Sequence, residues 1–448
     1  MIHTCNTFVN IACSGKEEES VNDRNYVSNA VCVKCGAVHE AKPDLTTCEK
    51  CGGILDIRYD YDRIRSDTDP AKIQARSDRS MWRYREFLPV RGDSLEDPAN
   101  GQGSKTALLP KLRVGWSPFY RADRLAREIG LETLYIKDDG INPTASLKDR
   151  ASAMAVVKAS EAGATTIACS STGNAASSLA GNAAAAGFET YIFVPERAPK
   201  GKVAQLMMFG AHVISVQGTY EDTFRLSAEA IDQYGWYNRN AAINPYLMEG
   251  KKTVSFEIAE QLNWKMTDYV AVSVGDGCTI AGVWKGFKDL FAAGFIDRLP
   301  RLISVQAQGC CPLNRAIAEG TDWRPMEENT IADSIAVGVP RNPDKALNAI
   351  RESNGVVVNV SDEEILAAMR LLGRTSGVFA EPAGAAATAG VKKAVGTGLI
   401  PQDASVVTIV TGSGLKDVAN AMKAAGDPLL LPPDLKRLEQ ALSAQGLV

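Results

Sequence analysis

The chain has 448 residues, of which 45% are hydrophobic and 23% charged, and its formal net charge is -4. This acidic balance argues against nucleic acid or an anionic membrane as a partner. No apolar run reaches the roughly 18 residues that span a membrane, and the first thirty residues lack the apolar centre of a signal peptide. We therefore expect a cytoplasmic protein.

The N-terminal part divides into three segments by composition. Residues 1–29 show no periodicity and predict a flexible arm. Residues 30–62 carry two cysteine pairs and predict a small zinc-ribbon-like unit. Residues 63–104 are charged and rich in glycine, proline and aspartate, apart from a short helical stretch around 81–87. We assign this third segment to a connector that lies on the main body.

The zinc prediction depends on the spacing of four of the ten cysteines. Cys32 and Cys35 form one C-x2-C pair, and Cys48 and Cys51 form a second pair twelve residues later. Such spacing is typical of a structural zinc site with four thiolate ligands. Metal-free buried thiols are the alternative. A zinc ribbon can also bind nucleic acid, but this unit has few basic side chains, so we favour a structural role.

From residue 133 onward, short apolar runs alternate with helical stretches. This rhythm predicts an α/β fold with two parallel-type sheets and helices on both faces. The crossovers should be right-handed. The predicted strands are 133–137, 165–171, 189–194, 212–216, 269–274, 302–306, 356–360 and 406–410, and helices are predicted from 147 and over 173–187, 201–209 and 220–234.

The first chemical motif is N-P-T-A-S-L-K-D-R, residues 142–150, which places Lys148 in the first turn of a helix. The positive end of the helix dipole disfavours a cation there. A desolvated lysine in such a place has a lowered pKa and becomes a nucleophile suited to forming a Schiff base. The alternative is a surface lysine paired with Asp149.

The second motif, S-S-T-G-N-A-A-S-S over residues 170–178, follows a predicted strand and opens a helix. Main-chain N–H groups at a helix start bind anions, and Ser171, Thr172 and Asn174 add side-chain donors. The alternative is a simple helix N-cap, although a cap needs one serine or threonine rather than this cluster.

Two further loops follow predicted strands. The glycine loop V-G-D-G-C-T-I-A-G, residues 274–282, is typical of a phosphate cup and also of a degenerate dinucleotide fingerprint. The segment T-G-S-G-L-K-D begins at Thr411, whose hydroxyl could meet a pyridine nitrogen or cap a turn. In open α/β sheets, ligands bind at the carboxyl ends of the strands. The four loops together therefore predict one site.

In this order, the four motifs resemble the threonine-synthase branch of the pyridoxal-phosphate enzymes of fold type II, the tryptophan synthase beta-like fold. The resemblance runs from about residue 32 to 425. It implies a large cofactor-binding domain over 105–151 and 243–425, a small domain over 152–242 and a C-terminal tail over 426–448. It also implies a homodimer.

The resemblance assigns a role to each loop. Lys148 would hold pyridoxal 5'-phosphate as a Schiff base, and Thr411 would face the pyridine nitrogen. Asn174 would contact the phenolic oxygen of the cofactor. The cofactor phosphate would bind to Gly275, Asp276, Gly277, Cys278 and Thr279, and the substrate would bind to Ser171, Thr172 and Gly173.

Two residues depart from the family pattern. Asp276 stands in the phosphate loop, where its charge must point away or be neutralised. Leu247 stands in N-P-Y-L-M-E-G where threonine synthases usually have an arginine that grips the substrate phosphate. Leucine cannot replace a guanidinium fork, so O-phosphohomoserine is doubtful as the substrate.

The resemblance implies elimination or replacement at the β or γ carbon of an amino-acid substrate. Two alternatives stay open. One is a cysteate-synthase-like β-replacement. The other is the pyridoxal subunit of a 2-amino-4-oxopentanoate-thiolase-like condensing enzyme, which needs a partner subunit. A zinc-ribbon adaptor on a decayed enzyme body is a non-enzymatic alternative, and the presence of Lys148, Asn174 and Thr411 argues against it.

Overall fold

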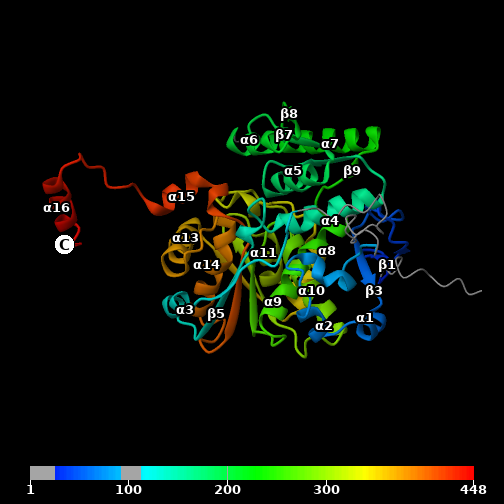
Figure 1. The fold of residues 1–448 in the computed structure, drawn as a ribbon, viewed down its shortest axis with the longest axis horizontal. Coiled ribbons are helices and arrows are strands. Elements are labelled where there is room, and N and C mark those ends of the chain that lie inside the picture. Colours follow the sequence, from blue (N-terminus) through cyan, green and yellow to red (C-terminus); the bar gives the residue numbers. More distant parts are fainter. Residues whose placement is uncertain (1–25, 92–111, 199, 448) are drawn as a thin grey trace, which may run out of the picture.

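The computed structural model describes residues 26–91, 112–198 and 200–447, which contain three separate sheets (Figure 1). The smallest sheet is N-terminal, the six-stranded sheet forms the large body, and the four-stranded sheet lies at the top of the view with helices α5, α6 and α7. Within these described ranges, no helix is both long and apolar enough to span a bilayer.

The six-stranded sheet has the order β12-β11-β10-β13-β5-β4, and only the β4–β5 pair is antiparallel. Its central strands are buried on both faces. On β10, Val270 and Val272 belong to one apolar core, and Tyr269 and Ala271 belong to the core on the other face. The strands are β4 (Phe119–Arg121), β5 (Thr133–Asp138), β10 (Tyr269–Ser273), β11 (Arg301–Ala307), β12 (Val356–Val360) and β13 (Ser405–Val410).

The helices of the large body cover both of these faces. Helices α9, α10 and α12 contribute to the first core, and α3, α13 and α14 contribute to the second. Their bounds are α3 (Asp123–Ile129), α8 (Tyr246–Lys251), α9 (Thr253–Gln261), α10 (Cys278–Ala292), α11 (Pro312–Glu319), α12 (Pro343–Glu352), α13 (Asp362–Ser376), α14 (Pro382–Gly396), α15 (Val418–Ala425) and α16 (Leu435–Ala444).

The four-stranded sheet is parallel throughout, with the order β8-β7-β6-β9. Helix α4 lies between this sheet and the large body, and it packs on both α5 and α8. The elements are α4 (Lys148–Glu161), β6 (Thr166–Ser170), α5 (Asn174–Ala186), β7 (Glu189–Pro195), α6 (Lys200–Met208), β8 (His212–Val216), α7 (Tyr220–Tyr234) and β9 (Tyr237–Asn238).

The N-terminal unit is an antiparallel sheet of three strands in the order β2-β1-β3. Its pairing starts at Val27, opposite Tyr59, so residues 27–29 begin a strand although we predicted them as part of an arm. Residues 1–25 of that arm and residues 92–104 of the connector lie outside the described residues. The elements are β1 (Val27–Cys32), β2 (Val38–His39), β3 (Leu55–Tyr59), α1 (Tyr61–Asp67), α2 (Pro70–Gln74) and the 3-10 helix η2 (Met81–Phe87).

The alternation seen in the sequence predicted the main strands well. All eight predicted strands are confirmed, with ends that differ by at most one residue. The predicted α/β fold with two parallel-type sheets and a small N-terminal unit is confirmed as well. The short strands β4 and β9 were not predicted, because two or three residues are too few to show a periodicity.

A fully buried network of charges joins these layers below the site. The Arg150 guanidinium contacts the Asp139 carboxylate at 2.7 Å and also binds Glu257 of α9. Lys137 of β5 contacts the same Glu257 carboxylate at 2.6 Å. All four side chains are inaccessible to solvent. Opposite charges this deep stabilise one another only while each keeps its partners.

We predict that Glu257→Ala destabilises the fold by about 3–5 kcal/mol, because it leaves Arg150 and Lys137 buried with too little negative charge. Denaturant unfolding monitored by circular dichroism measures the change. The matched control is Glu229→Ala, which breaks an exposed Arg225–Glu229 pair on α7 and should cost about 0.5 kcal/mol or less. Equal effects of the two substitutions would contradict the prediction.

Candidate active site

Lys148 is the first residue of α4. The turn that precedes it is hydrogen-bonded to the loop after β13. The N–H of Leu147 donates to the carbonyl of Thr411 at 2.9 Å, and Ser146 forms a bridge with Gly412. Ala145 has a φ of 66°, a left-handed conformation that alanine rarely adopts. The lysine motif and the T-G-S-G segment, which lie far apart in the sequence, are therefore adjacent.

The residue after the lysine does not pair with it. The Asp149 carboxylate accepts hydrogen bonds from the N–H and hydroxyl of Thr144 and from the Asn182 amide, each at 2.8 Å. Among the residues that the structure describes, nothing bonds to the Lys148 ammonium. Burial, together with the charge of Lys251, lowers the pKa of Lys148 to about 8. A lysine in this state is a better nucleophile near neutral pH than an exposed one.

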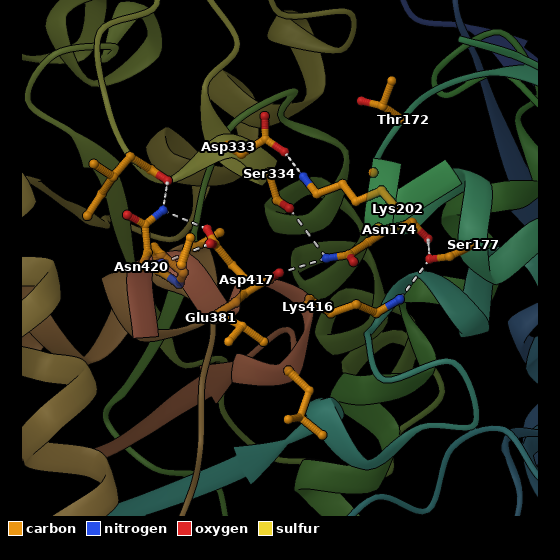
Figure 2. Close-up of a pocket in the computed structure, with 18 of the residues that line it drawn as sticks. Thr172, Asn174, Ser177, Lys202, Asp333, Ser334, Glu381, Lys416, Asp417 and Asn420 are labelled. Atoms are coloured by element: carbon orange, nitrogen blue, oxygen red, sulfur yellow. Dashed lines mark hydrogen bonds and ion pairs between the residues drawn. The ribbon is translucent and has the colours of Figure 1, made fainter. Parts of the chain in front are cut away.

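The second motif opens α5 and reaches across to α14. The Asn174 amide donates to Glu381 at 2.7 Å and to Ser334 at 3.3 Å. Figure 2 shows these groups beside Lys202 and Lys416. Burial raises the pKa of Glu381 to about 7, although the hydrogen bond from Asn174 opposes this. Glu381 can therefore change its protonation near neutral pH.

A cavity of about 580 Å³ lies in front of this motif. Thr172, Gly173 and Asn174 line one side of it, and Glu381 and Lys416 line another. The Lys416 ammonium bonds to the hydroxyl of Ser177 at 2.8 Å (Figure 2). The cavity is large enough for a small amino acid and carries both signs of charge.

The glycine loop connects β10 to α10 and has room only for glycine at two positions. A Cβ on Gly275 would lie 2.7 Å from the Cα of Ile335, and one on Gly277 would lie 2.5 Å from the carbonyl of Asn342. Gly277 also has a φ of 83°. Such a loop presents main-chain N–H groups at the start of α10, a 15-residue helix. This is the arrangement that binds a phosphate.

Both carboxylate oxygens of Asp276 have hydrogen-bond partners. Its carboxylate accepts a hydrogen bond from the N–H of Arg341 at 2.6 Å. Its other oxygen accepts a weak hydrogen bond from the Cys278 thiol at 3.7 Å, so the carboxylate lies between the loop before α12 and the start of α10. Cys278 is buried, which raises the pKa of its thiol and keeps it neutral. Thr279 is buried in the first turn of α10.

The structure joins the predicted residues through short links, although they do not all line one cavity. Thr172, Gly173 and Asn174 line the 580 Å³ cavity, whereas Lys148, Thr411 and the glycine loop lie outside its lining. The N–H of Glu381 donates to the carbonyl of Gly412 at 3.0 Å, which links the Asn174 side to Thr411. A glycine cup, an unpaired lysine and a hydroxyl at a strand end fit a pyridoxal phosphate.

Sequence reasoning gave no role to Glu381 or Lys416. Glu381 lies in the stretch E-P-A-G-A-A-A-T-A-G, where one acidic residue precedes a long apolar helix. That isolated acidic residue is the feature of the sequence that could have identified Glu381 as a site residue. Lys416 follows the predicted T-G-S-G turn, and its contact with Ser177 of α5 is visible only in the folded chain.

The four cysteines of the N-terminal unit come together as their spacing predicted. All four sulfurs lie within 4.8 Å of one another, and the shortest separation, from Cys51 to Cys35, is 3.4 Å. The separations are too long for disulfides. Four sulfurs from two C-x2-C turns form a donor set that suits one tetrahedral metal ion.

The comparisons with known proteins agree with this geometry. The family model described as "Pyridoxal-phosphate dependent enzyme" matches residues 111–412. The threonine synthases of Methanosarcina acetivorans and Methanocaldococcus jannaschii are each 39% identical to the chain over 414 residues. These alignments cover 92% of the chain and 98% of each relative.

Solved structures share the fold at lower identity. Threonine deaminase isoform 2 from Solanum lycopersicum aligns with a TM-score of 0.60 and 23% identity, over 69% of this chain and 87% of that one. Maize serine racemase aligns with a TM-score of 0.58 and 22% identity, over 73% and 92%. By sequence and fold, the chain therefore belongs to the pyridoxal-phosphate-dependent enzymes of fold type II and, within them, to the threonine synthase family.

Proposed function

We propose that the enzyme carries out elimination or replacement at the β or γ carbon of an amino-acid substrate, with Lys148 as the residue that holds the cofactor. The observation that carries this proposal is the unpaired Lys148 ammonium at the start of α4, beside Thr411. The bound cofactor supplies an electron sink for the carbon atoms of the substrate. Lys148 would hold the cofactor and would move a proton at the α carbon of the substrate.

The remaining residues hold the reactants in place. Ser171, Thr172 and Gly173 would bind the substrate carboxylate at the start of α5. Asn174 would contact the ring oxygen of the cofactor, and Thr411 would face its ring nitrogen. Gly275, Asp276, Gly277, Cys278 and Thr279 would form the loop around its phosphate.

The substrate differs from that of a threonine synthase in this proposal. Leu247 is 2% exposed and lines a small cavity, so the side chain at this position offers no hydrogen bond to a phosphate, although Lys251 and Lys345 line the same cavity. A cysteate-synthase-like β-replacement and a thiolase-like condensation with a partner subunit are the alternatives.

We also propose a structural zinc ion at Cys32, Cys35, Cys48 and Cys51, and a homodimer as the assembly. The sulfur-only donor set supports zinc rather than a harder metal ion. The unit packs on the body, because Tyr59 donates to Glu249 of α8 at 2.7 Å. A metal ion there would hold together the two cysteine-bearing turns of this small unit.

The attachment residue is tested by reduction. Borohydride treatment of the holoenzyme followed by peptide mapping should place the cofactor label on Lys148, because its buried ammonium has no bonding partner among the described residues and a lowered pKa. Lys148→Ala should abolish the label and the covalent cofactor absorbance. Lys288→Ala, which removes an exposed lysine of α10, is the control and should keep both. Label on another lysine would refute the assignment.

The metal proposal predicts one zinc per chain. Elemental analysis of protein purified without added metal should give one equivalent, and Cys48→Ser should reduce it because a tetrahedral site loses one ligand. Cys169→Ser, a buried cysteine of β6 outside the cluster, is the control and should retain the metal. Metal-free protein with four titratable thiols in the unit would contradict the zinc proposal.

We predict that O-phosphohomoserine is not the preferred substrate. A charged hydrogen bond contributes about 1.5–3 kcal/mol, so the absence of an arginine at position 247 should lower affinity about ten- to hundredfold. Phosphate release from O-phosphohomoserine is compared with release from other O-phospho amino acids. Leu247→Arg should raise kcat/KM for O-phosphohomoserine, whereas Leu247→Met should not. The highest wild-type kcat/KM for O-phosphohomoserine, with threonine as product, would show that another cation has replaced the arginine.

A further inference from the structure

The C-terminal arm, residues 426–447, leaves the body and carries exposed leucine side chains. Figure 1 shows helix α16 beyond α15 and apart from the sheets. No residue of α16 is buried, and every hydrogen bond found for residues 427–447 in the described chain has both partners within that segment. Leu430 is 94% exposed and Leu435 is 70% exposed. A contiguous apolar surface of this kind marks an interaction site.

The sequence nevertheless specifies both ends of α16. The Asp434 carboxylate caps its start by accepting a hydrogen bond from the N–H of Arg437 at 2.9 Å. A Schellman motif closes its end, where the N–H groups of Gly446 and Leu447 donate to carbonyls of the last turn. A helix of ten residues is only marginally stable in water on its own. The two caps therefore favour a helix that packs on a surface over a disordered tail.

The surface of the arm that needs cover is a stripe of leucines. Leu435, Leu438 and Leu442 are three and four residues apart, so they lie on one face of α16. Leu429 and Leu430, just before the helix, are exposed as well. Five leucines within fourteen residues are too many for a segment that contacts only water. We therefore expect the stripe to pack on an apolar partner surface.

The backbone of the arm directs it away from its own body. Gly426 has a φ of 82° and a ψ of -177°, a conformation that is essentially restricted to glycine. Pro428, Pro432 and Pro433 fix their own φ and hold the residues before them in extended conformations. A proline-rich linker of this kind acts as a semi-rigid spacer. The leucine stripe is therefore presented to a second molecule rather than folded back onto its own chain.

An exposed apolar patch lies on the body beside the base of the arm, and we call it the rim patch. Its members are 48–73% exposed: Ile141, Phe379, Leu415, Val418 and Met422. The segments that carry them are adjacent. The N–H of Gly414 donates to the carbonyl of Phe379 at 2.8 Å, and a Cβ on Gly140 would lie 3.1 Å from the nitrogen of Ser413. The patch therefore offers a continuous apolar surface.

The rim patch is also continuous with the candidate site. Leu415 and Val418 line the cavity of about 580 Å³, and Met422 follows Val418 by one turn on α15. Other exposed large hydrophobic residues of the described body are spread over separate elements, such as Phe291 of α10 and Leu399 after α14. The rim patch is therefore the described surface that best matches the leucine stripe.

We propose that the C-terminal arm of one chain packs its leucine stripe on the rim patch of a second copy. The proposal rests on the homodimer part of the proposed function and adds the surfaces that form it. Each chain carries one arm and one patch, so a two-fold axis lets both arms dock at once. Two copies of α16 packed only on each other would bury too little area for a stable interface. The docked arm would border the cavity of its partner, because Leu415 and Val418 belong to both patch and cavity.

Photo-crosslinking of the full chain tests the contact. The crosslinking residue p-benzoylphenylalanine replaces Leu438 in one protein and, as the control, Gln440 on the opposite face of α16 in another. After irradiation, denaturing gels separate crosslinks between two chains from crosslinks within one chain, and peptide mapping identifies the segment contacted. We expect a two-chain product that joins position 438 to the rim patch, and loss of most of that product when the crosslinker is at position 440.

Single substitutions provide a second measurement. Leu438→Glu and Met422→Glu should each raise the Kd of the dimer about ten- to hundredfold, the range expected for one buried apolar side chain. Gln440→Glu adds the same charge to the other face of the helix and should leave the Kd unchanged. Analytical ultracentrifugation at several protein concentrations measures the Kd, and circular dichroism shows whether each variant is folded.

Two results would overturn the docking assignment and leave the homodimer standing. One is a crosslink from position 438 that stays within a single chain, or that joins two chains away from the rim patch. The other is a dimer whose Kd responds equally to Leu438→Glu and Gln440→Glu. A wild-type protein that stays monomeric would instead contradict the homodimer itself, and the cofactor label on Lys148 tests the catalytic part of the proposed function independently of both.

Discussion

The guanidinium of Arg150 joins the segment before α4 to helix α9. It lies two residues after Lys148 and is held by Asp139 on one side and Glu257 on the other. Both carboxylates are buried; Asp139 also accepts a hydrogen bond from Ser117, and Glu257 also contacts Lys137. This shared network fixes the position of the first turn of α4. That turn then positions Lys148, the bridge between Ser146 and Gly412, and the start of α5, which packs on α4.

The N-terminal unit is connected to the same region through α8. The hydroxyl of Tyr246 donates to the carbonyl of Lys42, and Tyr59 donates to Glu249 one turn later on the helix. Leu55 lines the small cavity beside Leu247. Unfolding of the cysteine unit would therefore remove contacts of α8, the helix that carries Leu247.

The sequence predicted features that depend on local pattern, and it missed those that depend on distance. The apolar runs around Val270 and Val407 predicted the strands, and the C-x2-C spacing predicted the sulfur cluster. The choice between a paired and an unpaired Lys148 could not be made from the chain, because the partners of Asp149 include Asn182, 33 residues away. The absence of an ion-pair partner for Lys251 among the described residues likewise depends on side chains from several segments, so no local sequence pattern predicts it.

Charge is arranged by opposite rules in the scaffold and in the site. Below the site, Lys252 and Lys285 of the body share Glu249 and Asp289, so each buried cation has negative charge on more than one side. At the site, the charges of Lys251 and Arg239 both lower the pKa of Lys148, and none of these three cations forms an ion pair within the described residues. Cations placed together leave a strong field for an incoming anion. Unpaired cations stabilise the fold less than the paired cations of the scaffold do. This is the expected cost of a region that a cofactor and a substrate complete.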